Sequence, residues 1–270
     1  MQRYSADNLV AFQMYDRLYF VGCEKVSVHL IDTPEGLVLI DTGYPDMFDL
    51  ILDNIRTMGF DPKDICAIFH SHGHIDHFGC TQRLKELSGA KTYISRIDND
   101  IVNGKLDLSW ARELKLERLP YFDCDVLVED GDVFAFGDIS IRCVLTPGHT
   151  DGVLSFFITM GEEGIVAAMH GGIGFNSMSA AFLDDYDLSY GCRGQFLEGL
   201  HRLKKERVDL VLGNHPNQTG TLQKLNQLRQ GAHSILVENQ WQDFLQKTEQ
   251  RFYDFIRTEG KCSQTKRSCK

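Results

Sequence analysis

The chain has 270 residues, of which 43% are hydrophobic and 24% are charged, as in ordinary soluble globular proteins. Its 28 basic and 38 acidic side chains leave a net charge of −10, which argues against nucleic acid and anionic membranes as partners, because phosphates attract basic surfaces. No apolar run approaches the ~18 residues of a membrane helix, and the N-terminal residues lack a signal-peptide pattern. We therefore expect a cytoplasmic protein, or the mature form of an exported protein whose leader has been removed.

The first half of the chain alternates short apolar runs with segments of helical spacing. Apolar residues recur at helical spacing over residues 47–58 and 78–87, which predicts two helices. Residues 99–123 are polar and weakly periodic, and we interpret them as an excursion over a site. Continuous apolar runs predict strands at residues 18–21, 26–31, 37–40, 65–69 and 92–94.

The second half repeats this pattern. It predicts helices near residues 198–205, 220–231 and 238–257. The order strands, helices, strands, helices is typical of an α/β protein with a four-layer αβ/βα sandwich made of two similar halves. No linker separates the halves, so we expect one domain over residues 1–260, followed by a polar, basic tail at 261–270. The predicted strands of this half cover residues 125–128, 133–136, 139–145, 153–158, 165–169 and 208–212.

The strongest chemical signal is the segment His72-Gly73-His74-Ile75-Asp76-His77, which follows the predicted strand at 65–69. In an extended stretch, residues 72, 74 and 76 project to one side. Imidazole and carboxylate are donors that zinc accepts. A polar loop with surface histidines is the alternative, and the spacing favours a metal site.

Five predicted strands end in a His or Asp beside Gly or Pro, at Asp41, His72, His149, His170 and His215. Ligand sites of open α/β sheets lie at the carboxyl ends of strands. We therefore expect the five loops to meet at one edge and build a metal site. Three protein ligands with an open position are typical of a catalytic site. The six candidate donors make two such sets: His72, His74, His149, Asp76, His77 and His215.

These motifs resemble the metallo-β-lactamase superfamily, whose HxHxDH signature stands at residues 72–77. The segments at 37–43 and 147–150 and the later His215 fall in the family's order. The chain is most similar to the His-rich third subclass of metallo-β-lactamases, and the resemblance covers roughly residues 15–258. The segments shared with that subclass are residues 18–22, 33–36 and 214–216.

The resemblance implies a metal-dependent hydrolase with two zinc ions per chain. It implies that Asp76 is catalytic as well as a ligand, because it orients the attacking water. Asp41 would orient a ligating imidazole, or it is only a turn-forming residue before Thr42-Gly43. The resemblance assigns His72, His74 and His149 to the first ion. It assigns Asp76, His77 and His215 to the second ion.

His170 stands where many superfamily members carry a metal-bridging Asp, which the third subclass lacks. An imidazolate bridge would hold the metals farther apart than the ~3.5–4 Å of a two-metal hydrolase, so we expect no bridge here. Three roles stay open for His170: a pocket-lining residue, a weak alternative ligand, or a structural histidine. Asn176 and Ser177 are candidates for substrate contact, or they belong to a plain loop.

The leading functional prediction is a dinuclear zinc hydrolase that opens the cyclic amide of β-lactams, with a small molecule as its substrate. The alternative is a hydrolase of another ester, lactone, thioester or phosphodiester with at most weak β-lactamase activity. A metal-binding or redox module without hydrolysis is disfavoured, because related iron proteins use acidic ligands and an added flavin domain, which the sequence does not show. The sequence does not predict the oligomeric state.

Overall fold

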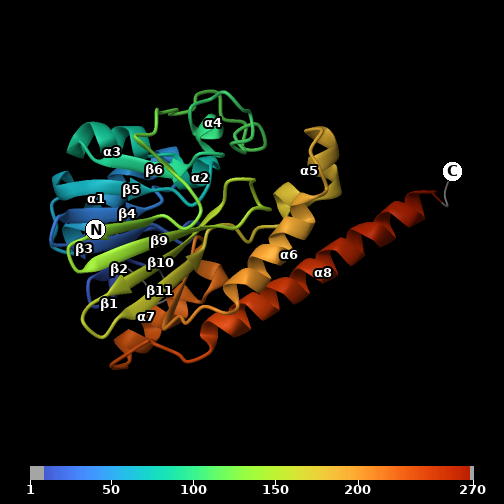
Figure 1. Cartoon of the computed structure of the whole chain (residues 1–270). Helices are drawn as coiled ribbons and strands as arrows, with labels where there is room; N and C mark the ends of the chain where they lie inside the picture. The colour runs from blue at the N-terminus through green and yellow to red at the C-terminus, as the bar shows by residue number, and fades with distance from the viewer. Residues whose placement is uncertain (1–8, 268–270) are drawn as a thin grey trace.

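Two β-sheets pack face to face, and helices cover the outer face of each sheet (Figure 1). The computed structural model describes residues 9–267, with side chains through residue 259. The arrangement confirms the predicted four-layer αβ/βα sandwich. The first sheet has seven strands in chain order: β1 Phe12–Tyr15, β2 Leu18–Phe20, β3 His29–Thr33, β4 Gly36–Ile40, β5 Ile65–Phe69, β6 Lys91–Ser95 and β7 Val126–Val128. The second has the order β12-β11-β10-β9-β8, with β8 Val133–Phe136, β9 Ile139–Leu145, β10 Leu154–Met160, β11 Ile165–His170 and β12 Leu210–Gly213.

Strand direction decides which loops share an edge. In the first sheet, β4 to β7 pair in parallel, so their carboxyl ends lie at one edge. In the second sheet, β11 pairs in parallel with β12, and β9 runs the same way because β10 is antiparallel to both β9 and β11. The loops after β4, β5, β9, β11 and β12 therefore leave their sheets at carboxyl edges, where α/β sheets place ligand sites.

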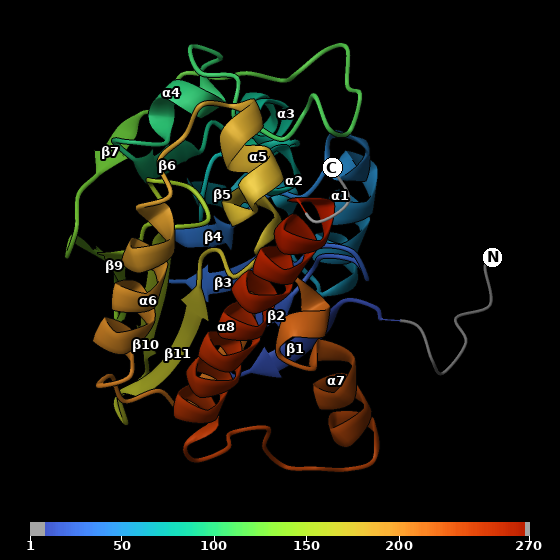
Figure 2. The same cartoon turned by 90° about the vertical axis from the view of Figure 1, so that its right-hand side faces the viewer.

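Alternation along the strands separates three hydrophobic layers. In β4, Val38 and Ile40 face the core between the sheets, whereas Leu37 and Leu39 face the helices outside. Each of these side chains is almost fully buried, which contributes about 1.5–3 kcal/mol per residue. The helices outside the first sheet are α1 Phe48–Thr57 and α3 Thr81–Ser88, and those outside the second are α6 Cys192–Leu203 and α8 Gln240–Arg267. In Figure 2, α8 crosses the second sheet diagonally, with α6 on one side and α7 Thr221–Arg229 on the other.

The helix predicted over 78–87 is wrong in its start, because two helices occupy this region. The short α2 spans Ile75–Phe78, and α3 begins only at Thr81. Between them, the Gly79 N–H donates to Gly43 O at 2.9 Å instead of continuing a helix. A Cβ on Gly79 would lie 2.4 Å from Pro45 N, so only glycine permits this close approach.

Other element boundaries also differ from the prediction. The strand predicted at 26–31 is β3, which begins later. Residues 198–205, predicted to belong to a helix, lie in α6 up to its end at Leu203. The last helix, α8, continues past residue 257 to Arg267, into the predicted tail at 261–270, whose residues 268–270 lie outside the described ones. Three short elements were not predicted: β1, α4 Asn99–Val102 and α5 Ala180–Asp185. Single 3-10 turns occur at Pro45–Met47, Pro62–Asp64, Asn176–Met178 and Pro216–Gln218.

Within residues 9–267, no helix has both the length and the hydrophobicity needed to cross a lipid bilayer.

Candidate metal centre

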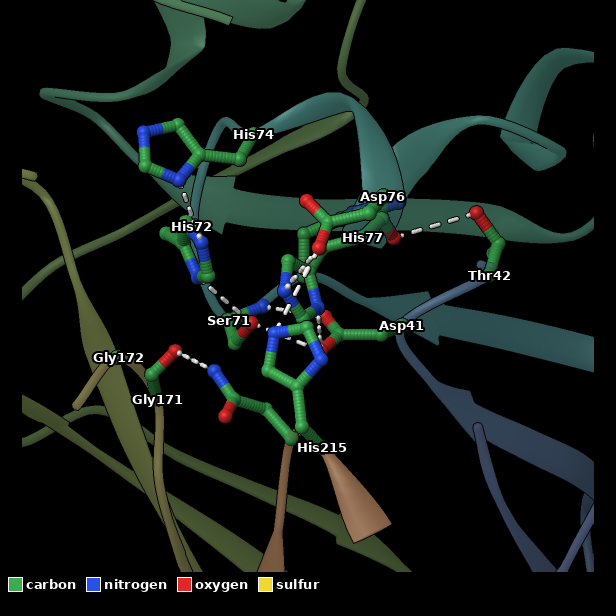
Figure 3. Close-up of polar contacts among 12 residues, drawn as sticks. Asp41, Thr42, Ser71, His72, His74, Asp76, His77, Gly171, Gly172 and His215 are labelled. Atoms are coloured by element: carbon green, nitrogen blue, oxygen red, sulfur yellow. Dashed lines mark hydrogen bonds and ion pairs between the residues drawn. The ribbon is translucent and has the colours of Figure 1, made fainter. Parts of the chain in front are cut away.

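Loops from both sheets meet at one edge of the sandwich and carry the predicted donors. Figure 3 shows these donors with the exception of His149. In the first sheet, Asp41 follows β4, and residues 71–77 follow β5. In the second sheet, His149 follows β9, and His215 follows β12. Side chains that are far apart in the sequence are thus side by side in space.

The first donor set consists of His72, His74 and His149, whose candidate ligand atoms lie within 4.8 Å of one another. His72 Nε2 lies 3.1 Å from His74 Nδ1. The ring centroid of His149 lies 4.7 Å from the ring centroid of His72 and 4.5 Å from that of His74. Three imidazoles converging on one point are the donor set of a catalytic zinc site.

The second donor set consists of Asp76, His77 and His215, again within 4.8 Å. Asp76 Oδ2 lies 3.4 Å from His77 Nε2 and 3.5 Å from His215 Nε2. The His77 ring lies 4.2 Å from the His72 ring, so the two sets are neighbours. The expectation that residues 72, 74 and 76 share one side is wrong for Asp76, because the chain turns into α2 at Ile75.

A buried carboxylate connects the two sets. Asp41 Oδ1 accepts a hydrogen bond from Ser71 N at 2.7 Å, and Oδ2 accepts from Ser71 Oγ at 2.8 Å. Oδ2 also lies 2.8 Å from His77 Nδ1. Since Ser71 Oγ gives its proton to Asp41, it must accept from His72 Nδ1, 3.0 Å away. Asp41 thus orients His77 directly and His72 through Ser71.

Two further histidines are oriented by backbone carbonyls. His149 Nδ1 donates to Gly174 O at 2.8 Å, and His215 Nδ1 donates to Lys25 O at 2.7 Å. A carbonyl only accepts, so the proton is on Nδ1 and the Nε2 lone pair of each neutral ring points into the centre. His77 Nε2 is buried there without a hydrogen-bond partner. A buried nitrogen without a hydrogen-bond partner destabilises the protein unless a group that is not part of the chain, such as a metal ion, binds it.

Burial keeps most of these rings neutral, which is the form that binds a metal. Burial lowers the pKa of four imidazoles, and the neighbouring histidines lower it further; these are His72, His74, His149 and His215, with His149 at about 4. His77 differs, because the Asp76 and Asp41 carboxylates outweigh burial and raise its pKa. Burial would raise the pKa of Asp41, but His77 and the Ser71 donors lower it.

The Asp98 carboxylate forms hydrogen bonds to two of the loops that carry candidate ligands. Its Oδ2 accepts from Gly73 N at 2.8 Å and from Thr150 Oγ1 at 2.6 Å, and its Oδ1 accepts from Gly152 N at 2.9 Å. Gly73 lies between two ligands of the first set, and Thr150 follows the third. Burial raises the pKa of Asp98 to about 6, although these three donors favour its ionised form.

The loop before His149 needs glycine at one position. Gly148 has φ +145°, and a Cβ there would lie 2.6 Å from Phe196 Cβ on α6. Any side chain would therefore push the loop off α6 and move His149.

His170 lies outside both donor sets, and the expectation that it does not bridge two metals stays a prediction. Its Nδ1 accepts from Gly172 N at 3.2 Å, so its proton is on Nε2, which is buried without a partner. Burial lowers its pKa to about 3, and its ring packs on Phe196. Ser177 is buried, and its Oγ lies 3.0 Å from His149 Nδ1 and donates to His149 O at 2.6 Å, whereas Asn176 is exposed.

Sequence reasoning missed two residues of this centre. Ser71 directly precedes the HxHxDH segment, so its position was a signal that it touches the ligands. Asp98 carries no such signal, because it lies in the polar stretch after β6, 52 residues from Thr150.

Comparison with known proteins gives one family. A family model described as the metallo-beta-lactamase superfamily matches residues 21–166, which hold five of the six donors and leave out His215. Hydroxyacylglutathione hydrolase of Maricaulis maris is 31% identical over 172 residues, 63% of this chain and 50% of that protein. N-acyl homoserine lactonase of Bacillus thuringiensis is 26% identical over 163 residues, 51% of this chain and 60% of that protein. The chain spans about half the length of the curated relatives that it matches first.

Solved structures resemble the chain over nearly its whole length. A subclass B3 metallo-beta-lactamase of Bradyrhizobium japonicum superposes with a TM-score of 0.80 at 25% identity, covering 95% of this chain and 97% of that one. A metallo-beta-lactamase of Legionella gormanii has a TM-score of 0.84 at 24% identity, covering 94% and 98%. The second likeness shows the fold alone.

We expect Asp98→Asn to destabilise the protein and to weaken metal binding at the first donor set. The amide nitrogen would face a backbone N–H from Gly73 or Gly152, and one buried donor left without an acceptor costs about 1–3 kcal/mol. Chemical denaturation of the metal-free protein and metal titration measure the two effects. Asp151→Asn, at an exposed neighbouring position, is the matched control. Equal stability and equal metal affinity in both variants would show that the hydrogen bonds of Asp98 do not hold the two ligand loops in place.

Proposed function

Since this chain belongs to the metallo-β-lactamase superfamily, we propose that it is a hydrolase that works with two zinc ions. The chemistry of the donors supports two ions: one set offers three imidazoles, and the other offers two imidazoles and a carboxylate. Bound there, zinc would polarise a carbonyl group and lower the pKa of water. The first ion would be held by His72, His74 and His149, and the second by Asp76, His77 and His215.

The observation that carries this proposal is the orientation of the imidazole rings by hydrogen bonds to other groups of the protein. Asp41 and the two backbone carbonyls hold Nδ1 of three rings, so each Nε2 is presented to the centre. Hydrogen bonds of this kind fix the tautomer and the direction of a metal-ligating histidine. These hydrogen bonds would hold the rings in the direction that zinc binding requires.

Asp76 is the acid–base residue of the proposed mechanism. Its Oδ2 lies between His77 and His215, and its side chain is 15% exposed, so the carboxylate reaches solvent. In this mechanism Asp76 orients the attacking water and accepts the proton that the water loses. Asp41 is buried behind the ligands and acts only by positioning them.

A cyclic amide of the β-lactam type is the leading substrate. The support is the near-complete superposition on a subclass B3 metallo-beta-lactamase at 25% identity. The histidine at position 170, where a bridging carboxylate would otherwise stand, agrees with that subclass.

A second candidate is the hydrolysis of an ester, lactone, thioester or phosphodiester, with at most weak activity on β-lactams. The names of the sequence relatives favour it, since they include a hydroxyacylglutathione hydrolase and an N-acyl homoserine lactonase. Either substrate class consists of small molecules.

Elemental analysis tests the metal content. We expect close to two zinc ions per chain after loading and dialysis, because there are two sets of three donors. The double variant His72→Ala/His74→Ala should retain one ion and the fold, and His170→Ala should retain both ions and change only turnover. His201→Ala, at an exposed histidine, is the control. Less than one ion in a folded wild-type protein would refute the proposal, and loss of an ion from His170→Ala would make that residue a ligand.

A substrate panel tests the reaction. The loaded protein should open a carbapenem or a cephalosporin, and removal of the metals with a chelator should reduce the rate to that of spontaneous hydrolysis. Efficient enzymes reach a kcat/KM of about 10⁴–10⁸ M⁻¹s⁻¹. If a lactone or an aryl phosphodiester is cleaved several decades faster than the β-lactams, the second candidate is correct and the first is not.

A further inference from the structure

A cavity of about 280 Å³ opens beside the first donor set and is bordered by His74 and His149. A group attached to the attacked carbonyl would enter it, because these two ligands form its inner wall. We propose that this cavity selects substrates whose side group is uncharged and apolar. The inference rests on the proposed function for the reaction, but it concerns the side group and not the bond that is broken.

Two segments supply the apolar walls. One is the excursion after β6, and the other is the region of α5. Their polar side chains on the wall are Asp98, Ser177 and Ser189, and none of these carries a positive charge. The apolar residues that the inference uses are Ile97, Ile101, Leu106, Leu108, Phe182 and Leu188.

Side chains of the two walls contact each other, and these contacts hold the walls of the cavity in place. The Trp110 ring stacks on Phe182, with centroids 4.9 Å apart and planes at 21°, and it lies 5.5 Å from the His74 ring. Arg112 pairs with Asp185 at 2.6 Å across the same junction. The stacked rings supply most of this contact, because an exposed ion pair contributes little.

The mouth of the cavity is apolar as well. Ile97 and Leu106 are 47% and 46% exposed. Large apolar side chains exposed around a cavity are typical of a binding site for an apolar ligand.

The charges around the cavity exclude an anionic side group. The only charged side chains on its wall, among the described residues, are Asp98 and Asp151, and no lysine or arginine lines it. A carboxylate at the far end of a side group would lose its hydration against apolar walls and would find no lysine or arginine on them. A cation would gain little, because Asp98 already accepts three hydrogen bonds from the protein and Asp151 is exposed at the rim. The ring carboxylate of a β-lactam would therefore have to lie outside this cavity.

The volume limits the size of the side group. At about 30 Å³ for each water-sized group, the cavity holds about nine such groups. By volume, the cavity has room for an acyl chain of about six carbons.

Hydrolysis of 4-nitrophenyl esters by the zinc-loaded protein tests the inference. In each reaction water adds to the acyl carbon, the bond to the nitrophenyl oxygen breaks, and an acid and nitrophenol are released. We expect kcat/KM to rise about fourfold for each added methylene between acetate and hexanoate, as expected for transfer of a methylene out of water. Six-carbon esters that end in a carboxylate (adipate half-ester) or an ammonium (6-aminohexanoate) should react at least tenfold more slowly than hexanoate. Equal or faster cleavage of either charged ester would overturn the inference.

Variants locate the effect in the cavity. Leu188→Ala should flatten the dependence on chain length, and Gln195→Lys, on the cavity wall, should raise the rate of the adipate half-ester relative to hexanoate. Val133→Ala, at an exposed position on β8, is the matched control and should change neither ratio. Unchanged ratios in Leu188→Ala and Gln195→Lys would place the selection elsewhere and refute the inference.

Binding separates this inference from the proposed function. Saturation-transfer NMR on the loaded protein should detect hexanamide, should detect adipamate only weakly, and should show weaker hexanamide binding to Leu188→Ala. If no ester or lactam is cleaved but this binding pattern appears, the proposed function fails and the inference stands. If substrates are cleaved but hexanamide does not bind, the inference fails and the proposed function stands.

Discussion

The hydrogen bonds of the Asp41 carboxylate are the constraint on which the rest of the centre depends. An ionised carboxylate that is only 1% exposed is stable only if its oxygens are fully hydrogen-bonded. Asp41 meets this requirement with Ser71 N, Ser71 Oγ and His77 Nδ1. Because both partner residues belong to segment 71–77 after β5, hydrogen bonding of the carboxylate also fixes the position of that segment. One candidate ligand of each donor set is thereby oriented by the protein itself.

The fold supplies the remaining orientation from longer distances. The carboxyl ends of β9 and β12 bring His149 and His215 from the second sheet to the loop from the first. Asp98 then bonds the loop that carries His72 and His74 to the loop that carries His149. The centre is therefore a junction between the sheets, and its geometry depends on how the two halves of the sandwich pack. Ligands that come from several separate loops keep a fixed geometry only when the scaffold that carries the loops is rigid.

The sequence predicted the parts of this structure that depend on local pattern. Apolar runs located most strands and the layer order, and donor residues after strand ends located all six candidate ligands. The side on which Asp76 lies was not predictable from extended geometry, because α2 begins at Ile75, whose N–H donates to Ser109 O from a distant part of the chain. The role of Asp98 and the apolar cavity depend on side chains that meet only after folding, and no spacing in the sequence encodes such contacts.

The central claim, that one buried carboxylate orients both donor sets, is tested most directly by the zinc affinity of Asp41→Asn compared with Ser71→Ala. Calorimetric titration of the metal-free proteins reports both sites. The account predicts that Asp41→Asn weakens both zinc sites by about 10–100-fold, the usual effect of losing a residue that orients a ligating histidine, whereas Ser71→Ala weakens chiefly the site that contains His72. Two sites of wild-type affinity in a folded Asp41→Asn protein would contradict it.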